Sequence, residues 1–170
     1  MSMRDIAITL TIALAVVALL AMLFAWRRRL RRDAGLTAPL GVPEHAEVTS
    51  RDEVLYVSTT RHDEPLERVT ISPLAYRARG ELAVTDRGVA LCLDGAPTVF
   101  LASSRLVDVD RATVTIDRVV ERGGLVRIAW NASDDVVVDS YLRVVSGDPT
   151  SLISDLQRLV PAAPDTGASS

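Results

Sequence analysis

The chain has 170 residues, which is enough for a membrane segment and one globular domain but too short for two domains of ordinary size. It carries 19 arginines and no lysine against 22 acidic residues, so the formal net charge is −3. A single cysteine, Cys92, excludes an intrachain disulfide and any metal site built from several cysteines.

The first predicted element is a transmembrane helix over residues 6–26. These 21 residues carry no charge, and a helix of this length reaches about 31 Å, close to the thickness of the hydrocarbon core of a bilayer. Trp26 at its end is the expected interfacial anchor. Small residues recur in it at spacings of four or eight, which leaves a homodimer through this helix open: Thr9, Ala13, Ala21 and Ala25.

A cluster of arginines follows the apolar run directly and is expected at the membrane interface beside Trp26: Arg27, Arg28, Arg29, Arg31 and Arg32. Positive charge beside a span stays on the cytoplasmic side, so we expect the N-terminus outside and the rest of the chain in the cytosol. A cleaved signal peptide fits less well, because its basic residues come before a shorter apolar run and a small-residue cleavage site follows that run.

The chain beyond the arginine cluster is acidic. From Asp33 onward, 13 arginines stand against 21 acidic residues, a formal balance of −8. Nucleic-acid binding needs a basic surface, so this balance argues against it. An anionic leaflet should attract the arginine cluster and repel the rest of the domain.

Residues 27–51 are expected to be the arginine cluster and a linker or a loosely packed arm, because 33–52 contain two glycines and two prolines without a sustained period. Short β-rich segments follow, with hairpin turns predicted at Asp86-Arg87-Gly88 and at Gly123-Gly124. The sequence predicts an antiparallel meander of about seven strands, in a barrel or a sandwich. The segments are 54–60, 66–71, 81–85, 89–93, 98–102, 112–120, 125–130 and 136–145.

The last predicted element is a helix that begins at Asp148, a good N-cap, with Pro149 at its first position. Its apolar residues recur with a helical period, so one face should cover an open end of the sheet. They are Leu152, Ile153, Leu156, Leu159 and Val160. Residues 161–170, rich in Pro, Ala, Gly and Ser, predict a disordered tail.

A series of short stretches carries a family likeness: Tyr56-Val57-Ser58-Thr59-Thr60, Pro65-Leu66-Glu67-Arg68-Val69, Tyr76-Arg77-Ala78-Arg79-Gly80, Thr85-Asp86-Arg87-Gly88-Val89, Thr115-Ile116-Asp117-Arg118-Val119-Val120, Gly123-Gly124-Leu125 through Trp130, and Val138-Asp139-Ser140-Tyr141-Leu142-Arg143. In this order they resemble the PH-like domain (pleckstrin-homology superfold) of small bitopic membrane proteins from high-GC bacteria. The resemblance covers residues 52–160. It implies a mainly β fold, a seven-stranded antiparallel barrel with one capping helix, preceded by one transmembrane helix and tethered to the cytoplasmic face.

No motif in the sequence indicates catalysis, a cofactor or a metal, so we expect no enzyme and no cofactor. His45 and His62 fall in loop-like sequence, where histidines are usually solvated. Cys92 is expected to be a small buried apolar residue. The glycine pair 123–124 lies between strands and therefore does not form a phosphate loop.

Lipid headgroups are expected to bind poorly at the loop between the first two strands. PH domains that bind phosphoinositides place several basic residues there, whereas residues 61–64 supply one sure cation and two acids. Arg68, Arg77 and Arg79 form the candidate ligand patch elsewhere. Their charges would equally well serve only to keep strand edges from pairing.

The favoured hypothesis is a single-pass inner-membrane protein that presents a non-catalytic PH-like binding module, an adaptor or scaffold, to the cytosol. Its partner would be a protein or peptide that docks on a strand edge or beside the C-terminal helix. The alternative is a transport- or export-associated component that binds lipid headgroups or whose domain lies outside the cytosol. A third hypothesis is an enzyme with an unrecognised site that involves His62, Asp117 or Arg143.

Overall fold

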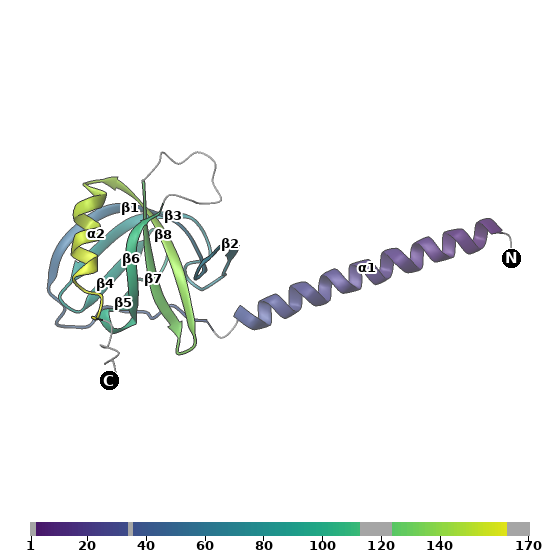
Figure 1. The fold of residues 1–170 in the computed structure, drawn as a ribbon, viewed down its shortest axis with the longest axis horizontal. Helices are drawn as coiled ribbons and strands as arrows, with labels where there is room; N and C mark the ends of the chain where they lie inside the picture. The colour runs from purple at the N-terminus through teal and green to yellow at the C-terminus, as the bar shows by residue number, and fades with distance from the viewer. Residues whose placement is uncertain (1–2, 34–35, 113–123, 163–170) are drawn as a thin grey trace, which may run out of the picture. The chain divides into compact units, whose positions relative to one another are not determined.

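The structure is a computed structural model that describes residues 3–33, 36–112 and 124–162 (Figure 1). Its contacts divide the chain into two units, Met1–Gly35 and Leu36–Ser170. The first unit is helix α1 (Met3–Asp33), whose part Arg4–Arg28 is long and apolar enough to span a membrane, with a mean hydropathy of 2.8. Trp26, Arg27 and Arg28 are exposed on it, and the side chains of Arg29, Arg31 and Arg32 lie outside the described part.

The second unit is built on one antiparallel sheet, in which eight strands are described. They run in the order β5-β4-β3-β1-β8-β7-β6, and β2 pairs with β1 off this path. Because β5 and β6 end the path of the described strands, the sheet is open and has eight strands, where the sequence predicts a seven-stranded antiparallel barrel. The strands are β1 (Val48–Arg61), β2 (Glu64–Arg68), β3 (Ala78–Thr85), β4 (Gly88–Leu93), β5 (Val99–Ala102), β6 (Leu106–Ala112), β7 (Leu125–Ser133) and β8 (Val136–Ser146).

Strand β1 joins the two halves of the sheet. Its first part pairs with β3, and its second part pairs with β8, where Thr60 lies opposite Asp139. The register with β8 shifts between Glu53 and Val54 and again between Tyr56 and Ser58. Such irregularities bend a strand and increase its twist, so the sheet curls around a core in Figure 1.

The core lies inside this curl. Its largest fully buried side chains come from most of the sheet, and they include Trp130, Tyr56, Leu82, Ile128 and Leu142. The segment after β2 contributes Val69, Ile71 and Leu74 to the same cluster. The predicted strand over residues 66–71 therefore ends at Arg68, because the next residues turn inward to fill the core.

A chain of hydroxyl groups crosses this core. The Tyr56 hydroxyl donates to the Leu74 carbonyl at 2.8 Å, so its contact with Thr59 Oγ1, also 2.8 Å, makes Thr59 the donor. Ser140 Oγ lies 2.8 Å from Thr59 Oγ1 and accepts from Trp130 Nε1 at 2.9 Å. Each hydroxyl thus accepts one hydrogen bond and donates one. The chain of hydrogen bonds runs in a single direction, from Trp130 on β7 to Leu74 in the loop before β3. Burial raises the pKa of Tyr56 to about 12, so this hydroxyl keeps its proton at neutral pH.

The C-terminal helix α2 (Pro149–Gln157) confirms the predicted element and its start. Leu152 and Leu156 are buried in the core, and Figure 1 shows α2 beside β6 and β7. Gln157 Nε2 donates to the Val109 carbonyl of β6 at 2.8 Å. The helix therefore covers the β6 end of the open sheet and occupies part of its backbone edge.

The N-cap of α2 gives a test of pH dependence. Asp148 Oδ1 accepts from Thr150 N at 3.0 Å, and this hydrogen bond lowers the pKa of Asp148 below its ordinary value of 3.8. A carboxyl group whose pKa is lower in the folded state than in the unfolded state stabilises the fold at pH values above its unfolded pKa. This stabilisation is lost as the pH falls through its folded pKa. We expect Asp148→Ala to lower Tm at pH 7 and to lose this effect in strong acid. Asp148→Asn, which also caps, should restore Tm at pH 7. Thermal unfolding at both pH values measures this, and an equal deficit of the alanine variant at both would contradict it.

The sequence leaves a linker or a loosely packed arm open for the segment before β1, and the structure favours a packed arm. Leu36 and Ala38 are buried in the core. The Pro39 carbonyl accepts from Phe100 N at 2.9 Å, and Gly41 N donates to the Thr98 carbonyl at 3.1 Å. We call residues 36–41 the arm. The arm packs along the outer edge of β5, so the folded unit begins at Leu36 instead of residue 52.

Other sequence predictions have mixed outcomes. The turn at Asp86-Arg87 between β3 and β4 is confirmed. Residues 113–120 of the predicted strand 112–120, Gly123 and most of the predicted tail lie outside the described residues, and only Ala112 of β6 falls within a predicted strand. Cys92 is half-buried on β4 instead of in the core, and Thr98 Oγ1 donates to its sulfur at 3.5 Å.

Candidate functional site

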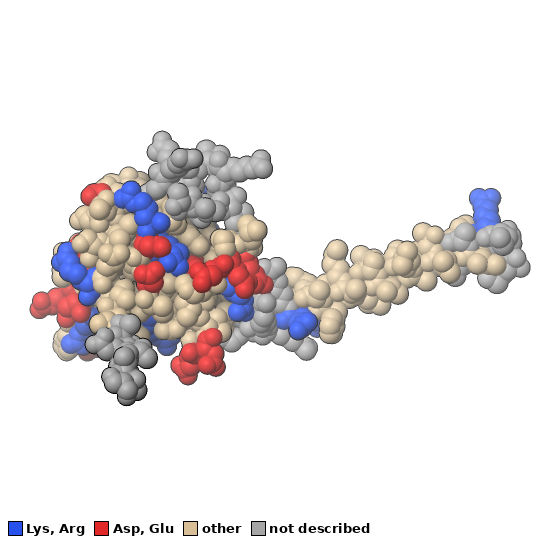
Figure 2. Space-filling model, in the orientation of Figure 1, with Lys and Arg blue, Asp and Glu red and all other residues tan. Residues whose placement is uncertain are grey.

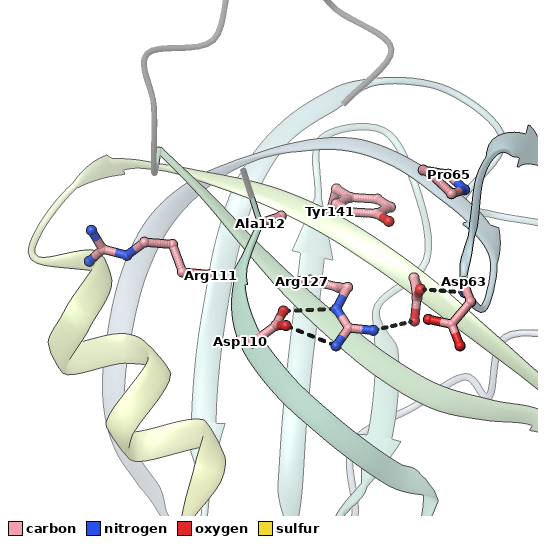
Figure 3. Close-up of a pocket in the computed structure, with 8 residues that line it drawn as sticks. Asp63, Pro65, Asp110, Arg111, Ala112, Arg127 and Tyr141 are labelled. Carbon is pink, nitrogen blue, oxygen red and sulfur yellow. Dashed lines mark hydrogen bonds and ion pairs between the residues drawn. The ribbon is translucent and has the colours of Figure 1, made fainter. Parts of the chain in front are cut away.

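A pocket of about 380 Å³ lies on the outer face of the sheet, beside the turn between β1 and β2 (Figure 3). The strands β6, β7 and β8 supply most of its wall, and Asp63 and Pro65 form the rim at the turn. Its lining residues are Asp63, Pro65, Asp110, Arg111, Ala112, Arg127, Asp139 and Tyr141.

Strand register brings these side chains together. Asp110 of β6 lies opposite Arg127 of β7, and Arg127 lies opposite Tyr141 of β8. Asp139, two residues before Tyr141, points to the same face because side chains alternate along a strand. Ser140, between Asp139 and Tyr141, faces the core and joins its hydroxyl chain, so the charged side chains gather on the outer face.

Arg127 is the centre of the site, and its guanidinium contacts three carboxylates. It binds Asp110 through two contacts, at 2.8 Å from Nε and 2.9 Å from Nη2. Nη2 also donates to Asp108 at 2.7 Å, and Nη1 to Asp139 at 3.4 Å. The hydrogen bonds with Asp110 are the main cause that raises the pKa of Arg127 above its ordinary value, and the charge of Asp139 adds to it.

Asp139 is the most buried acid of the site, with 2% of its side chain exposed. Besides Arg127, it contacts His62 Nδ1 at 2.8 Å and accepts from Asp63 N at 3.3 Å. Since an ionised carboxylate can only accept, His62 Nδ1 carries the proton in this contact. The expectation of a solvated His62 is therefore wrong, because this half-buried ring and the Asp63 amide fasten the β1–β2 turn onto β8.

Two further side chains set the polarity of the pocket. Burial raises the pKa of Tyr141 above its ordinary value and keeps its hydroxyl neutral, although a hydrogen bond with Thr60 acts in the opposite direction. Arg111 extends toward α2 (Figure 3), where its Nη2 donates to Thr150 Oγ1 at 2.8 Å. Its charge is therefore directed away from the pocket.

The site is acidic in sum. Asp108, Asp110 and Asp139 contact the guanidinium of Arg127, and Asp63 adds a fourth carboxylate at the pocket rim. Figure 2 shows acidic side chains over β6 and, further along the same face, near β2, with arginine among them. Such a pocket repels phosphate and suits a cationic or hydrogen-bond-donating group. Among the described residues, no group of three or more His, Cys, Asp or Glu could hold a metal ion.

The structure separates the predicted patch from this pocket. Arg68 lies on β2, Arg77 in the loop before β3 and Arg79 on β3, all exposed, and the described lining of the pocket does not include them. Arg143 is half-buried on β8, Asp117 lies outside the described residues, and His45 is exposed.

Sequence reasoning missed the central residues of the site, namely Asp108, Asp110, Arg127 and Asp139. A usable signal was the alternation of apolar and acidic residues from Val107 to Asp110, which is typical of a strand with one solvent-exposed face. The pairing of that strand with Arg127 carries no local signal, because it depends on the register of β6 against β7.

Comparison with known families agrees with the fold. Residues 37–157 match the family model described as bacterial PH domain-like. A search among curated proteins finds no match to the chain. The family match covers well over half of the 170 residues. The chain therefore belongs to the bacterial PH domain-like family.

Proposed function

We propose that this protein is a single-pass inner-membrane protein whose PH-like domain is a non-catalytic binding module for a protein partner. A cationic side chain or segment of that partner would dock in the pocket around Arg127. The observation that carries this proposal is the surplus of carboxylates there: three acids contact one arginine, and a fourth, Asp63, lies at the pocket rim.

The depth of the pocket supports a docking role over a purely structural one. Asp139 and Arg127 are largely buried, whereas Asp108 and Asp110 keep about half of their side-chain surface exposed. The exposed oxygens can accept from a further donor while the inner pair holds them in place. This combination of a fixed inner shell and open acceptors suits recognition of an ammonium or guanidinium group.

The anchor supports the membrane part of the proposal. Arg4–Arg28 is long and apolar enough to span a bilayer, and the arginine cluster behind it favours a cytosolic domain with the N-terminus outside. The homodimer through the small residues of α1 belongs to the same proposal. A reporter-fusion topology assay tests the orientation. Activity of a reporter that functions only outside the cytosol, fused after residue 170, would refute it.

The docking site is tested by photocrosslinking in native membranes. A benzoylphenylalanine in place of Pro65, at the pocket rim, should crosslink one partner protein in the full-length chain. Asp110→Asn should reduce the crosslinked fraction roughly tenfold, because the loss of one charge-assisted contact of about 1.5 kcal/mol corresponds to that factor.

A matched control separates the pocket from net charge. Asp94→Asn makes the same change of charge at an exposed turn between β4 and β5, and it should leave the crosslink unchanged. Equal losses in the two variants, or no crosslinked partner above background at Pro65, would count against docking in this pocket.

A further inference from the structure

The two most exposed large apolar side chains of the second unit, within its described residues, are Leu66 and Tyr76. Leu66 of β2 is 81% exposed, and Tyr76, in the loop before β3, is 82% exposed. Neither contributes to the core or to the Arg127 pocket. An aliphatic and an aromatic side chain that are this exposed in a small domain indicate an interaction surface that becomes covered.

These two side chains belong to one continuous surface. Side chains alternate along β2, so Leu66 and Arg68 point to the same side, and both are exposed. Arg68 Nη2 donates to the Ala75 carbonyl at 3.0 Å, which brings the loop that bears Tyr76 against β2. Arg77 follows Tyr76 directly, Arg79 lies two residues further on β3, and both are exposed. We call these five residues the β2 surface: Leu66, Arg68, Tyr76, Arg77 and Arg79.

The β2 surface differs in charge from the rest of the acidic domain. Three arginines lie on it, and Glu64 is the exposed acid on the same face of β2. Glu81, two residues after Arg79, is bound by Arg51. Arginines beside an aliphatic and an aromatic side chain are the composition of protein surfaces that rest on anionic bilayers.

The chain that joins α1 to the second unit is short. Only residues 34–35 separate Asp33, the last residue of α1, from Leu36, which is fixed in the core. Three steps between α-carbons reach at most about 11 Å, and the seven residues of α1 beyond Trp26 add about 10 Å. A domain of this size has a radius of gyration of about 14 Å, so its surface can touch the lipid headgroups.

We propose that the β2 surface is a contact site for an anionic bilayer, with Leu66 and Tyr76 at the headgroup level and the arginines beside lipid phosphates. This inference rests on the proposed anchor but not on the Arg127 pocket or on which side the domain occupies. The tether makes the contact intramolecular, so even a weak surface holds the domain in one orientation.

The test uses the full chain with Cys92→Ser and Leu66→Cys, labelled at residue 66 with the environment-sensitive dye NBD. The protein is placed in nanodiscs of phosphatidylcholine alone or mixed with phosphatidylglycerol. We expect stronger, blue-shifted emission with phosphatidylglycerol. The same label at Ser151→Cys, exposed on α2 and across the domain from β2 in Figure 1, should report water in both.

The arginine contribution is tested by Arg77→Gln with Arg79→Gln, which leaves the bond from Arg68 to Ala75 intact. This variant should lose most of the response to phosphatidylglycerol. Water-like emission at residue 66 in both nanodiscs would overturn the proposal, and so would an apolar signal that follows protein concentration instead of lipid, since a second copy would then cover the surface. A chain that fails to co-elute with nanodiscs would refute the anchor, and this inference with it.

Discussion

Arg127→Ala should lower the free energy of unfolding by about 3 kcal/mol, which is the scale expected when one partner of a buried ion pair is removed. The variant leaves Asp139, 2% exposed, without its cation. It also leaves Asp108 and Asp110 facing each other without the guanidinium that both contact. Thermal and denaturant unfolding of the full chain measures this, followed by Trp130 fluorescence in a Trp26→Phe background.

Two variants show whether the loss arises from the uncompensated charge. Arg127→Met with Asp139→Asn removes both charges and should recover most of the stability, because a neutral pair requires no buried counterion. Arg51→Ala breaks the exposed pair with Glu81 and should cost less than about 1 kcal/mol. If Arg127→Ala unfolds like Arg51→Ala, the pocket does not contribute to the stability of the sheet.

Ser140→Ala should cost about 2 kcal/mol, because it removes the middle of the buried hydroxyl chain. Trp130 Nε1 then has no acceptor, and Thr59 loses the hydroxyl that donates to it. A buried donor without a partner costs about 1–3 kcal/mol, although the deleted atom is small. Loss of the hydrogen bond from the indole should also shift Trp130 emission to shorter wavelength.

The matched control makes the same substitution at the end of the same strand. Ser146 lies at the exposed end of β8, so Ser146→Ala should stay within about 0.5 kcal/mol of the parent. Tyr56→Phe breaks the chain at its opposite end, leaves the Leu74 carbonyl unpaired and should resemble Ser140→Ala. Near-identical stability of Ser140→Ala and Ser146→Ala would mean that the hydroxyl chain adds nothing to the fold.

Local signals in the sequence account for much of the fold. The period of Leu152 and Leu156 with the cap at Asp148 predicts α2, and Asp86-Arg87-Gly88 predicts the β3–β4 turn, because both depend on neighbours within a few residues. The sequence could not separate a packed arm from a linker, because Pro39 and Gly41 are typical of both. Only the edge of β5, some sixty residues later, supplies partners for its backbone groups.

The site was harder to predict than the fold for the same reason. In the sequence, Arg127 resembles any other strand arginine, and only strand register shows that it lies opposite Asp110. Asp63 likewise looks like an ordinary loop acid, although its amide donates to Asp139. His62 was interpreted as solvated because its sequence neighbours are polar. Its partner, Asp139, is 77 residues away and gives no local signal. Charge counts gave the correct sign for the domain, but the position of the acidic pocket depends on pairing.

The arm also decides where this chain can be cut. A fragment that starts at Val48, the first residue of β1, would lack Leu36 and Ala38 and leave two openings in the hydrophobic interior. It would also remove the backbone hydrogen bonds that the arm makes with Thr98 and Phe100. The edge of β5 would then be free to pair with strands of other molecules. Fragments for crystallisation should therefore begin at or before Leu36, and shorter ones are candidates for aggregation during expression.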